Sequence, residues 1–426
     1  MGITKAIIDN INTAKANYIE TFLREQNIKR ADDEEGMDTK YWVNLLLQSG
    51  RLNVNTFEEF LVSELFYGKR KQIRVYKLED CRKYAYPSDW QMGLERYGDG
   101  NSGDFSNILN SQPNEKCPIK IVFTSMIQNE QGELENIKIL FAHFIQVVNG
   151  ENSFEDTCSY IPVEIDFRSR RMTMKAWQRQ YIQWETDKTD ALFEKTLHIL
   201  EDDFRVEIGN YGIEHKKILY LMSKNLINDA YLKIPAFSEV DNLRDSIRDF
   251  ANSVVEKLPL ENAVMDDSGE KRLNPGVMKF EEELRNVVEG LTINDYFFEK
   301  DFSEIWNMGL EAIVARIKFN DKERVLTSLK GENTLTPIFV TKTFMTLRER
   351  MNESEMVDAI WIATDRDKGN LNLRYDSSNS NYLEIWIRYG IRFCEKDMKS
   401  AFRIYDKYEQ CFTSKIKGKT AIAVNQ

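Results

Sequence analysis

The 426-residue chain is poor in the residues that most often carry metal, redox or catalytic chemistry. It has only three histidines and five cysteines, and no two cysteines form a C-x-x-C pair. An odd number of widely spaced cysteines argues against a disulfide framework and indicates free thiols in a reducing compartment. We therefore expect a cytoplasmic protein with no cofactor and no bound metal.

Long apolar runs are also missing. The longest one, residues 137–148, is far shorter than the roughly 20 residues that span a bilayer. The N-terminal sequence MGITKAIIDNI places Lys5 and Asp9 where a signal peptide needs an apolar stretch. We expect a soluble protein that has no membrane partner.

An excess of positive charge is absent, because 58 lysines and arginines face 69 aspartates and glutamates, for a net charge of -11. The mean field of such a chain repels polyanions, so any contact with nucleic acid must come from local basic patches. Hydrophobic residues make up 42% and aromatic residues 12%, which excludes wholesale disorder. The length predicts two or three domains.

Nucleotide-binding motifs are incomplete. GDGNSG (98–103) matches G-x-G-x-x-G in letters, but no strand precedes it, and Asp99 and Asp104 would repel phosphate. Gly418-Lys419-Thr420 ends like a P-loop, yet Thr413 occupies the place of the first glycine. We predict that residues 98–103 form an ordinary loop and that this chain does not hydrolyse ATP.

The histidines have structural explanations. His143 is in phase with Ile139, Phe141 and Ile145 on one apolar strand face, which predicts a buried histidine with a satisfied ring. His198 lies one helical turn from Glu201 and Asp202, a spacing that could hold a metal, but no second histidine motif completes the site. A solvated helix face is the better interpretation there.

The periodicity of apolar residues predicts a multi-domain α+β protein. A mostly helical N-terminal domain with a terminal strand at 72–78 is expected over residues 1–110. Central β-hairpins followed by helices form a second α+β domain over 111–264, and the polar segment 265–276 is the predicted linker. A third α+β domain covers 277–426, with a hairpin at 312–329, a buried strand at 357–363 and a closing helix.

The segment Ile161–Trp177 alternates like a β-hairpin. Its alternation places Ile165 and Met174 toward the core and sets Glu164 against Lys175 on the other face. Ser-Arg is a poor pair for a two-residue turn, so a four-residue loop with the same facing is expected. An ion pair with Glu164 would explain Lys175 without any ligand.

Basic residues near aromatic ones form two patches that could contact a phosphate backbone and stacked bases. The alternative is that both are ordinary solvated turns. The residues we predict to bind nucleic acid are Lys69, Arg70, Lys71 and Arg74 in the first patch, and Arg168, Arg170, Arg171, Lys175, Trp177 and Arg179 in the second, where Tyr181 and Trp184 follow.

Acidic residues near predicted strand ends suggest a second kind of chemistry in the C-terminal domain. A metal-dependent nuclease needs two or more carboxylates around a divalent ion and a base that orients water. The candidates are Asp358, Asp365, Asp367, Asp376 and Glu384, with Lys368 as the nearest base. Exposed loop acids are the ordinary alternative.

The sequence does not decide whether the protein is an enzyme. Our first hypothesis is a non-enzymatic intracellular recognition protein that contacts DNA or RNA through the two patches and binds a protein partner or forms a homo-oligomer. A component of a prokaryotic antiviral defence or mobile-element system would fit this description. The alternatives are a metal-dependent nuclease or phosphodiesterase in the C-terminal domain, and a protein–protein adaptor whose tryptophans and arginines mark interfaces.

Overall fold

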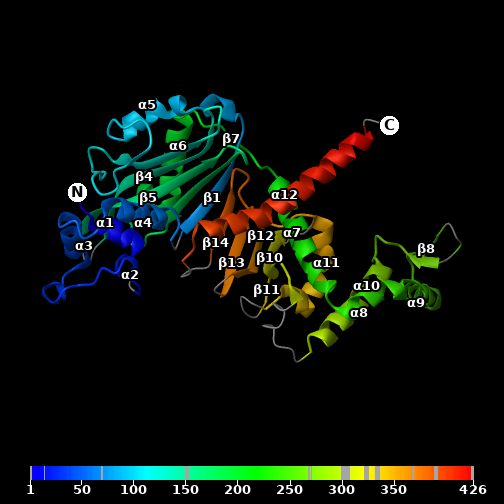
Figure 1. The fold of residues 1–426 in the computed structure, drawn as a ribbon. Coiled ribbons are helices and arrows are strands. Elements are labelled where there is room, and N and C mark those ends of the chain that lie inside the picture. The colour runs from blue at the N-terminus through cyan, green and yellow to red at the C-terminus, as the bar shows by residue number, and fades with distance from the viewer. Residues whose placement is uncertain are drawn as a thin grey trace. The chain divides into compact units, whose positions relative to one another are not determined.

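A computed structural model gives the fold of the chain (Figure 1). It describes residues 2–423 except 14, 69–70, 149–152, 267–268, 270, 299–307, 321–325, 332–335, 367–368 and 388–391. Contacts divide the chain into two compact units. Unit 1 comprises Met1–Gly212 with Asn379–Arg403, and unit 2 comprises Ile213–Ser378 with Ile404–Gln426.

Unit 1 begins with helices and continues as a sheet. Its elements are α1 (Lys5–Ile11), α2 (Tyr18–Glu25), α3 (Thr39–Gln48), α4 (Val54–Phe66), β1 (Lys71–Leu78), α5 (Pro87–Tyr97), β2 (Phe105–Ser106), β3 (Ile119–Gln128), β4 (Leu134–Val148), β5 (Phe154–Asp166), β6 (Arg171–Trp177), α6 (Thr189–Asp202), β7 (Ile208–Gly209), β14 (Leu383–Ile387) and the first turns of α12 (Glu395–Ala423). The strands lie in the order β14-β1-β6-β5-β4-β3-β2, and β7 also pairs with β1. The described strand pairs of this unit are antiparallel.

The two faces of the unit 1 sheet carry different side chains, because neighbours along a strand point to opposite sides. One face is apolar and packs on α5 and α6 through residues such as Ile139, Val163 and Met174. The other face contacts α1 and α4, and Arg171 lies 4.5 Å from the Phe402 ring in α12. Lys71 and Lys175 lie on this second face, which we call the helical-cover face.

Unit 2 combines a smaller sheet with helices. Its elements are α7 (Glu214–Tyr231), α8 (Pro235–Ser238), α9 (Arg244–Lys257), β8 (Ala263–Met265), β9 (Lys271–Leu273), α10 (Phe280–Tyr296), β10 (Ile313–Asn320), β11 (Leu326–Lys330), α11 (Lys342–Ser354), β12 (Ala359–Arg366), β13 (Gly369–Asp376) and the rest of α12. The antiparallel order is β11-β10-β12-β13, and α7 and α11 pack on β10. Helices α9 and α10 lie together with the β8–β9 hairpin (Figure 1).

The predicted α+β class is confirmed, and most predicted elements are present. The strand predicted at 72–78 is β1, the predicted central hairpins are β3–β4 and β5–β6, and most of the buried strand predicted at 357–363 lies in β12. Helix α4 starts at Val54, and the side chain of Asn53 caps it by accepting a hydrogen bond from the amide of Thr56.

The two units do not follow the three predicted domains. Strand β1, expected to end an independent N-terminal domain, pairs with β6 along seven residues and with β14 from the far end of the chain. Residues 1–110 and 111–212 therefore share one sheet. The predicted linker at 265–276 contains β9 and the end of β8. Strand pairing between segments so distant in sequence leaves no local pattern, so the composition of the sequence does not show which segments share a sheet.

Candidate functional site

The β5–β6 hairpin carries the second predicted patch, and its geometry is that of the four-residue loop. Ile165 pairs with Met172 and Val163 with Met174, which leaves residues 167–170 as the loop. The predicted register was wrong by two residues, because the strand partner of Glu164 is Thr173 and not Lys175. Arg170 adopts a positive φ of 51° in this loop. The expected facing is confirmed, since Val163, Ile165, Met172 and Met174 are all fully buried.

The three arginines at the hairpin tip have different surroundings. Arg168 is 76% exposed and forms an ion pair with Glu135. Arg170 is exposed in the loop. Arg171 is half-buried, with its guanidinium 4.5 Å from the centre of the Phe402 ring. The tip therefore does not present three equivalent free cations to a phosphate backbone.

Lys175 belongs to a buried ionic network on the helical-cover face. Its side chain is completely buried and pairs with Glu164, as the sequence suggested. Glu164 also accepts a 2.7 Å hydrogen bond from the Tyr67 hydroxyl and lies 3.4 Å from the Lys138 ammonium. Burial alone would raise the pKa of Glu164, but the two lysines outweigh it and hold that pKa below its usual value.

A cavity of about 290 Å³ lies beside this network within unit 1. Its wall includes Tyr67, Lys138 and Glu164 on one side and Glu395 and Lys399 of α12 on the other. Lys138 lies 3.6 Å from Glu395, which in turn pairs with Lys399 at 2.9 Å. The charges that line the cavity therefore already satisfy one another.

Lys71 is the most unusual cation of the first patch. Only 4% of the residue is exposed, and its ammonium has no hydrogen-bond or ion-pair partner among the residues that the structure describes. Burial, together with repulsion from Lys175, lowers the pKa of Lys71 to about 7, and Glu64 offsets only part of this effect. A buried ammonium without a carboxylate destabilises the fold.

Arg74 lies on the opposite face of β1 from Lys71, against α6. It pairs with Asp190 and with Glu194 at 3.2 Å, and its guanidinium is sandwiched between the rings of Phe193 and Tyr382 at 4.6 and 4.4 Å. The residue is 4% exposed. It acts as a buried structural cation in this arrangement.

The aromatic residues after β6 are more accessible. The Arg179 guanidinium stacks 4.7 Å from the Trp177 ring, and one of its nitrogens donates to the Thr157 hydroxyl at 3.3 Å. Tyr181 is 75% exposed and Trp184 54% exposed. These two rings could stack on a flat ligand.

The predicted patch residues are therefore brought together only in part. Lys71, Arg171, Lys175 and Trp177 share the helical-cover face, whereas Arg74 lies on the other face. Lys69 and Arg70 lie outside the described residues. Lys71, Arg74 and Lys175 are buried, so in this conformation a phosphate backbone could reach few of the predicted cations.

Three of the acidic residues proposed for a nuclease, Asp358, Asp376 and Glu384, form hydrogen bonds or ion pairs with protein side chains. Asp358 is buried between Lys216, at 2.7 Å, and Asn320, at 2.8 Å. Asp376 pairs with Arg374, and Glu384 accepts a 2.9 Å hydrogen bond from Gln72. Asp365 is exposed on β12, and Asp367 and Lys368 lie outside the described residues. Across the described ranges no three histidine, cysteine or acidic residues are grouped to hold a metal ion.

The interpretation of His143 and His198 is confirmed. His143 is buried, a ring nitrogen lies 2.8 Å from the Thr196 hydroxyl, and burial lowers its pKa to about 3. His198 is 71% exposed on α6, and its ring lies 3.8 Å from the Glu201 carboxylate.

The segment 98–103 forms the loop that was predicted. Asp99 lies in this loop after α5, where it accepts a hydrogen bond from the Ser111 hydroxyl and forms an ion pair with Lys120 at 2.9 Å. His143 and Asp99 therefore have structural roles, and His198 lies on a solvated helix face.

A feature that the sequence analysis missed lies on α10. Val287 and Leu291 are 69% and 68% exposed on one side of this helix, with the half-buried Leu284 in line with them. The opposite side of α10 is buried through Glu289 and Ile293. We call the exposed row Leu284, Val287, Leu291 and Asn294 the outer stripe of α10. The spacing of three and four residues between apolar positions is visible in the sequence. It does not show which of the two apolar faces of the helix packs against the rest of the protein.

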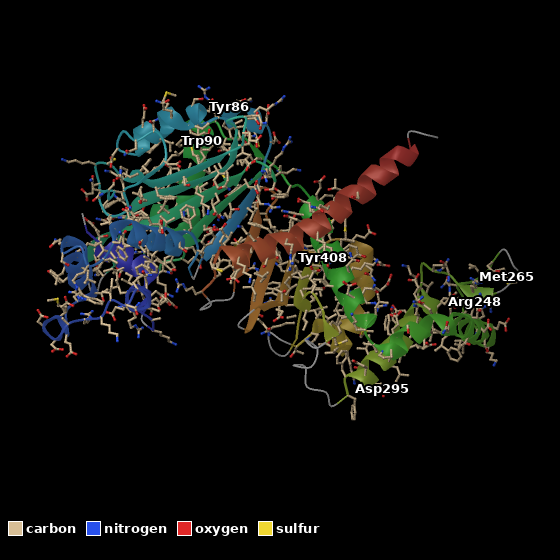
Figure 2. All side chains as sticks on the ribbon, viewed as in Figure 1. Tyr86, Trp90, Arg248, Met265, Asp295 and Tyr408 are labelled. Atoms are coloured by element: carbon tan, nitrogen blue, oxygen red, sulfur yellow. The ribbon has the colours of Figure 1, made fainter. Side chains whose placement is uncertain are left out.

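Exposed apolar side chains are concentrated around this helix. They include Phe250 of α9, 58% exposed, Met265 of β8, 66% exposed, and Phe298 after α10, 71% exposed. Figure 2 labels Met265, Arg248 and Asp295, which all belong to this part of unit 2. A groove of about 480 Å³ also runs between α9, β9 and the start of α10. Such a concentration is typical of an interaction surface.

Comparison of the chain with protein-family models, with curated proteins and with solved structures found no match. No helix in the described part of the chain is both long and apolar enough to cross a membrane.

Proposed function

We propose that this chain is a recognition protein that binds another protein through the exposed apolar surface around α9 and α10. The observation that carries the proposal is the outer stripe of α10, a row of three aliphatic side chains and one asparagine on a helix whose other side is packed. Burying such side chains against a partner stabilises a complex by roughly 25 cal/mol for each Å² of apolar area. The stripe contributes nothing comparable to the isolated chain.

The distribution of apolar side chains supports a protein partner. Of the 23 exposed large apolar residues in the described part of the chain, 11 fall within residues 232–298. They are Leu232, Leu243, Phe250, Leu258, Val264, Met265, Val277, Met278, Val287, Leu291 and Phe298. A nucleic-acid surface would instead need unpaired cations, and the predicted ones in β1 and β6 are mostly buried.

Photocrosslinking tests this proposal. A benzophenone amino acid placed at Leu291 should give one discrete adduct with a second protein in an extract of the source cells. The same group at Tyr41, which is 73% exposed on α3, should give at least tenfold less adduct. Val287→Glu should abolish the adduct from position 291, because it sets a charge in the apolar contact, while stability changes by only about 0.5 kcal/mol at this exposed site.

Two results would contradict the proposal. One is an equal yield of adduct from positions 41 and 291, which would indicate non-specific contact. The other is an adduct from position 291 that Val287→Glu leaves intact. An adduct made of two copies of this chain would replace the separate partner with a homo-oligomer.

Contact with nucleic acid is a second candidate function, favoured by the exposed rings of Tyr181 and Trp184. If they stack on bases, the Tyr181→Ala, Trp184→Ala double variant should weaken binding of single-stranded DNA or RNA by about 2 to 6 kcal/mol in total. Filter binding at low salt would measure this loss. Absence of binding by the unaltered protein at low salt would eliminate the hypothesis.

A further inference from the structure

We infer that the segment of the partner which docks on α10 is a basic amphipathic helix that lies along the outer stripe. This inference rests on the proposed function and specifies the chemistry of the partner. It follows from three properties of α10: the spacing of the exposed side chains, the rigidity of the helix and the charges beside the stripe.

The spacing is that of a helix–helix contact. Leu284, Val287, Leu291 and Asn294 follow one another at steps of three, four and three residues, the heptad rhythm that a second helix matches with its own side chains. At 1.5 Å per residue the row is about 15 Å long, which about three turns of a partner helix would cover. The exposed Asn294 interrupts the apolar row and, as a polar residue in such a seam, would fix the register.

The helix is held rigidly from its other side. Buried Glu289 pairs with Arg285 at 2.9 Å and with Arg348 of α11, and Arg348 also donates to Asn286 at 2.6 Å. The single contact that a side-chain carbon at Gly290 would meet is the Met345 methyl at 3.5 Å, so α10 and α11 approach closely at this point. A stripe fixed in this way loses little conformational entropy when a partner binds.

Charge selects the partner. Helix α10 carries Glu281, Glu282, Glu283, Glu289 and Asp295 against the single base Arg285. Glu283 and Asp295 flank the stripe on its two sides at the spacing of a helical wheel, and no hydrogen bond or ion pair of either carboxylate is found within the described part of the chain. Lysines or arginines at the flanking positions of a partner helix would meet these carboxylates, whereas a second copy of α10 would bring more acid to them.

Two labelled peptides test the inference with the full-length protein. Both carry leucines at alternating steps of three and four residues; one has lysines at the flanking positions and its twin has glutamates there. Fluorescence anisotropy should show the lysine peptide binding at least tenfold more tightly than its twin. The Glu283→Lys, Asp295→Lys double variant should reverse that preference.

The matched control is the Glu256→Lys, Glu261→Lys double variant. It makes the same change in net charge at exposed positions of the same region, outside α10. It should keep the preference of the unaltered protein within about twofold, since long-range charge is largely screened at physiological salt.

The outcomes separate the two proposals. Equal binding of both peptides, no binding of either, or an equal effect of the control variant would overturn the basic-helix inference. If the crosslinked adduct from position 291 still forms in that case, the protein-recognition proposal stands with a different partner chemistry. If the lysine peptide binds as expected but no adduct forms, the stripe is a peptide site and the proposed cellular function fails.

Discussion

Replacing Lys71 with methionine is expected to stabilise the protein by about 2 to 4 kcal/mol at pH 7. The cause is the Lys71 ammonium, which is buried and has no ion pair with a carboxylate among the described residues. Burial and repulsion from Lys175 lower the pKa of Lys71 from 10.5 to about 7. Each unit of pKa difference between the folded and unfolded states corresponds to about 1.4 kcal/mol, which sets the upper bound.

The sign of the pH dependence follows from the same shift. The unfolded chain binds a proton at Lys71 up to about pH 10.5, whereas the folded chain releases it near pH 7. The destabilisation by Lys71 is therefore complete below pH 7 and disappears as the pH rises toward 10.5. Urea unfolding at several pH values should show the stability difference between Lys71→Met and the unaltered protein shrinking across that window.

Lys77→Met is the control for this measurement. Lys77 lies on the same strand and the same face of β1, but it is exposed. Its replacement should change the stability by no more than about 0.5 kcal/mol at any pH in the window. A stability difference for Lys71→Met that stays constant with pH would show that its amine is not buried as the fold places it.

A lysine that destabilises its own fold is retained more readily if it contributes to function. Lys71 and Lys175 occupy neighbouring strands on one face, where repulsion between them adds to the effect of burial. If the Lys71→Met variant is more stable and still gives the crosslinked adduct from position 291, Lys71 is not needed for partner recognition through α10.

The sequence predicted local structure well where one face of an element has a clear period. In the β5–β6 hairpin the alternation from Val163 to Met174 located the core side, although the register predicted with it was wrong by two residues. The same rule placed His143 inside, because its neighbours two residues away on either side are apolar. Both inferences use only contacts within a strand pair or a strand face.

The burial of the cations could not be read from the sequence because distant segments cause it. Lys71 was interpreted as part of a charged turn, yet β1 is inserted between β6 and β14, and α4 precedes it on the same face. Lys71 and Arg74 are three residues apart on β1, so their side chains lie on opposite faces of the sheet and have different environments. Pairing partners hundreds of residues apart leave no trace in a local window.

The exposure of the outer stripe of α10 could not be predicted from the sequence either. The segment Met278–Val288 reads as amphipathic, but α10 has apolar residues on two sides, and only its packing on α9 and α11 shows that Ile293 is covered while Leu291 is exposed. Unequal exposure of two apolar faces is a tertiary property. It is also the feature on which the functional proposal depends.

Replacing Glu164 with glutamine is expected to destabilise the protein by about 3 to 5 kcal/mol, the largest loss of folding stability that we predict. The change keeps the shape of the side chain but removes the charge that compensates completely buried Lys175 and nearby Lys138. Breaking a buried ion pair by removing one partner leaves the other charge desolvated and unpaired. Urea unfolding at pH 7 measures the effect.

Glu155→Gln is the matched control, because Glu155 pairs with Lys5 at 2.6 Å at a site where the lysine is 60% exposed. Removing a surface pair of this kind should cost no more than about 1 kcal/mol. In contrast, the Glu164→Leu, Lys175→Met double variant removes both buried charges and should regain most of the stability lost in Glu164→Gln. If the double variant is as unstable as Glu164→Gln, the loss comes from packing or from the Tyr67 hydrogen bond, and the ionic network is not the cause.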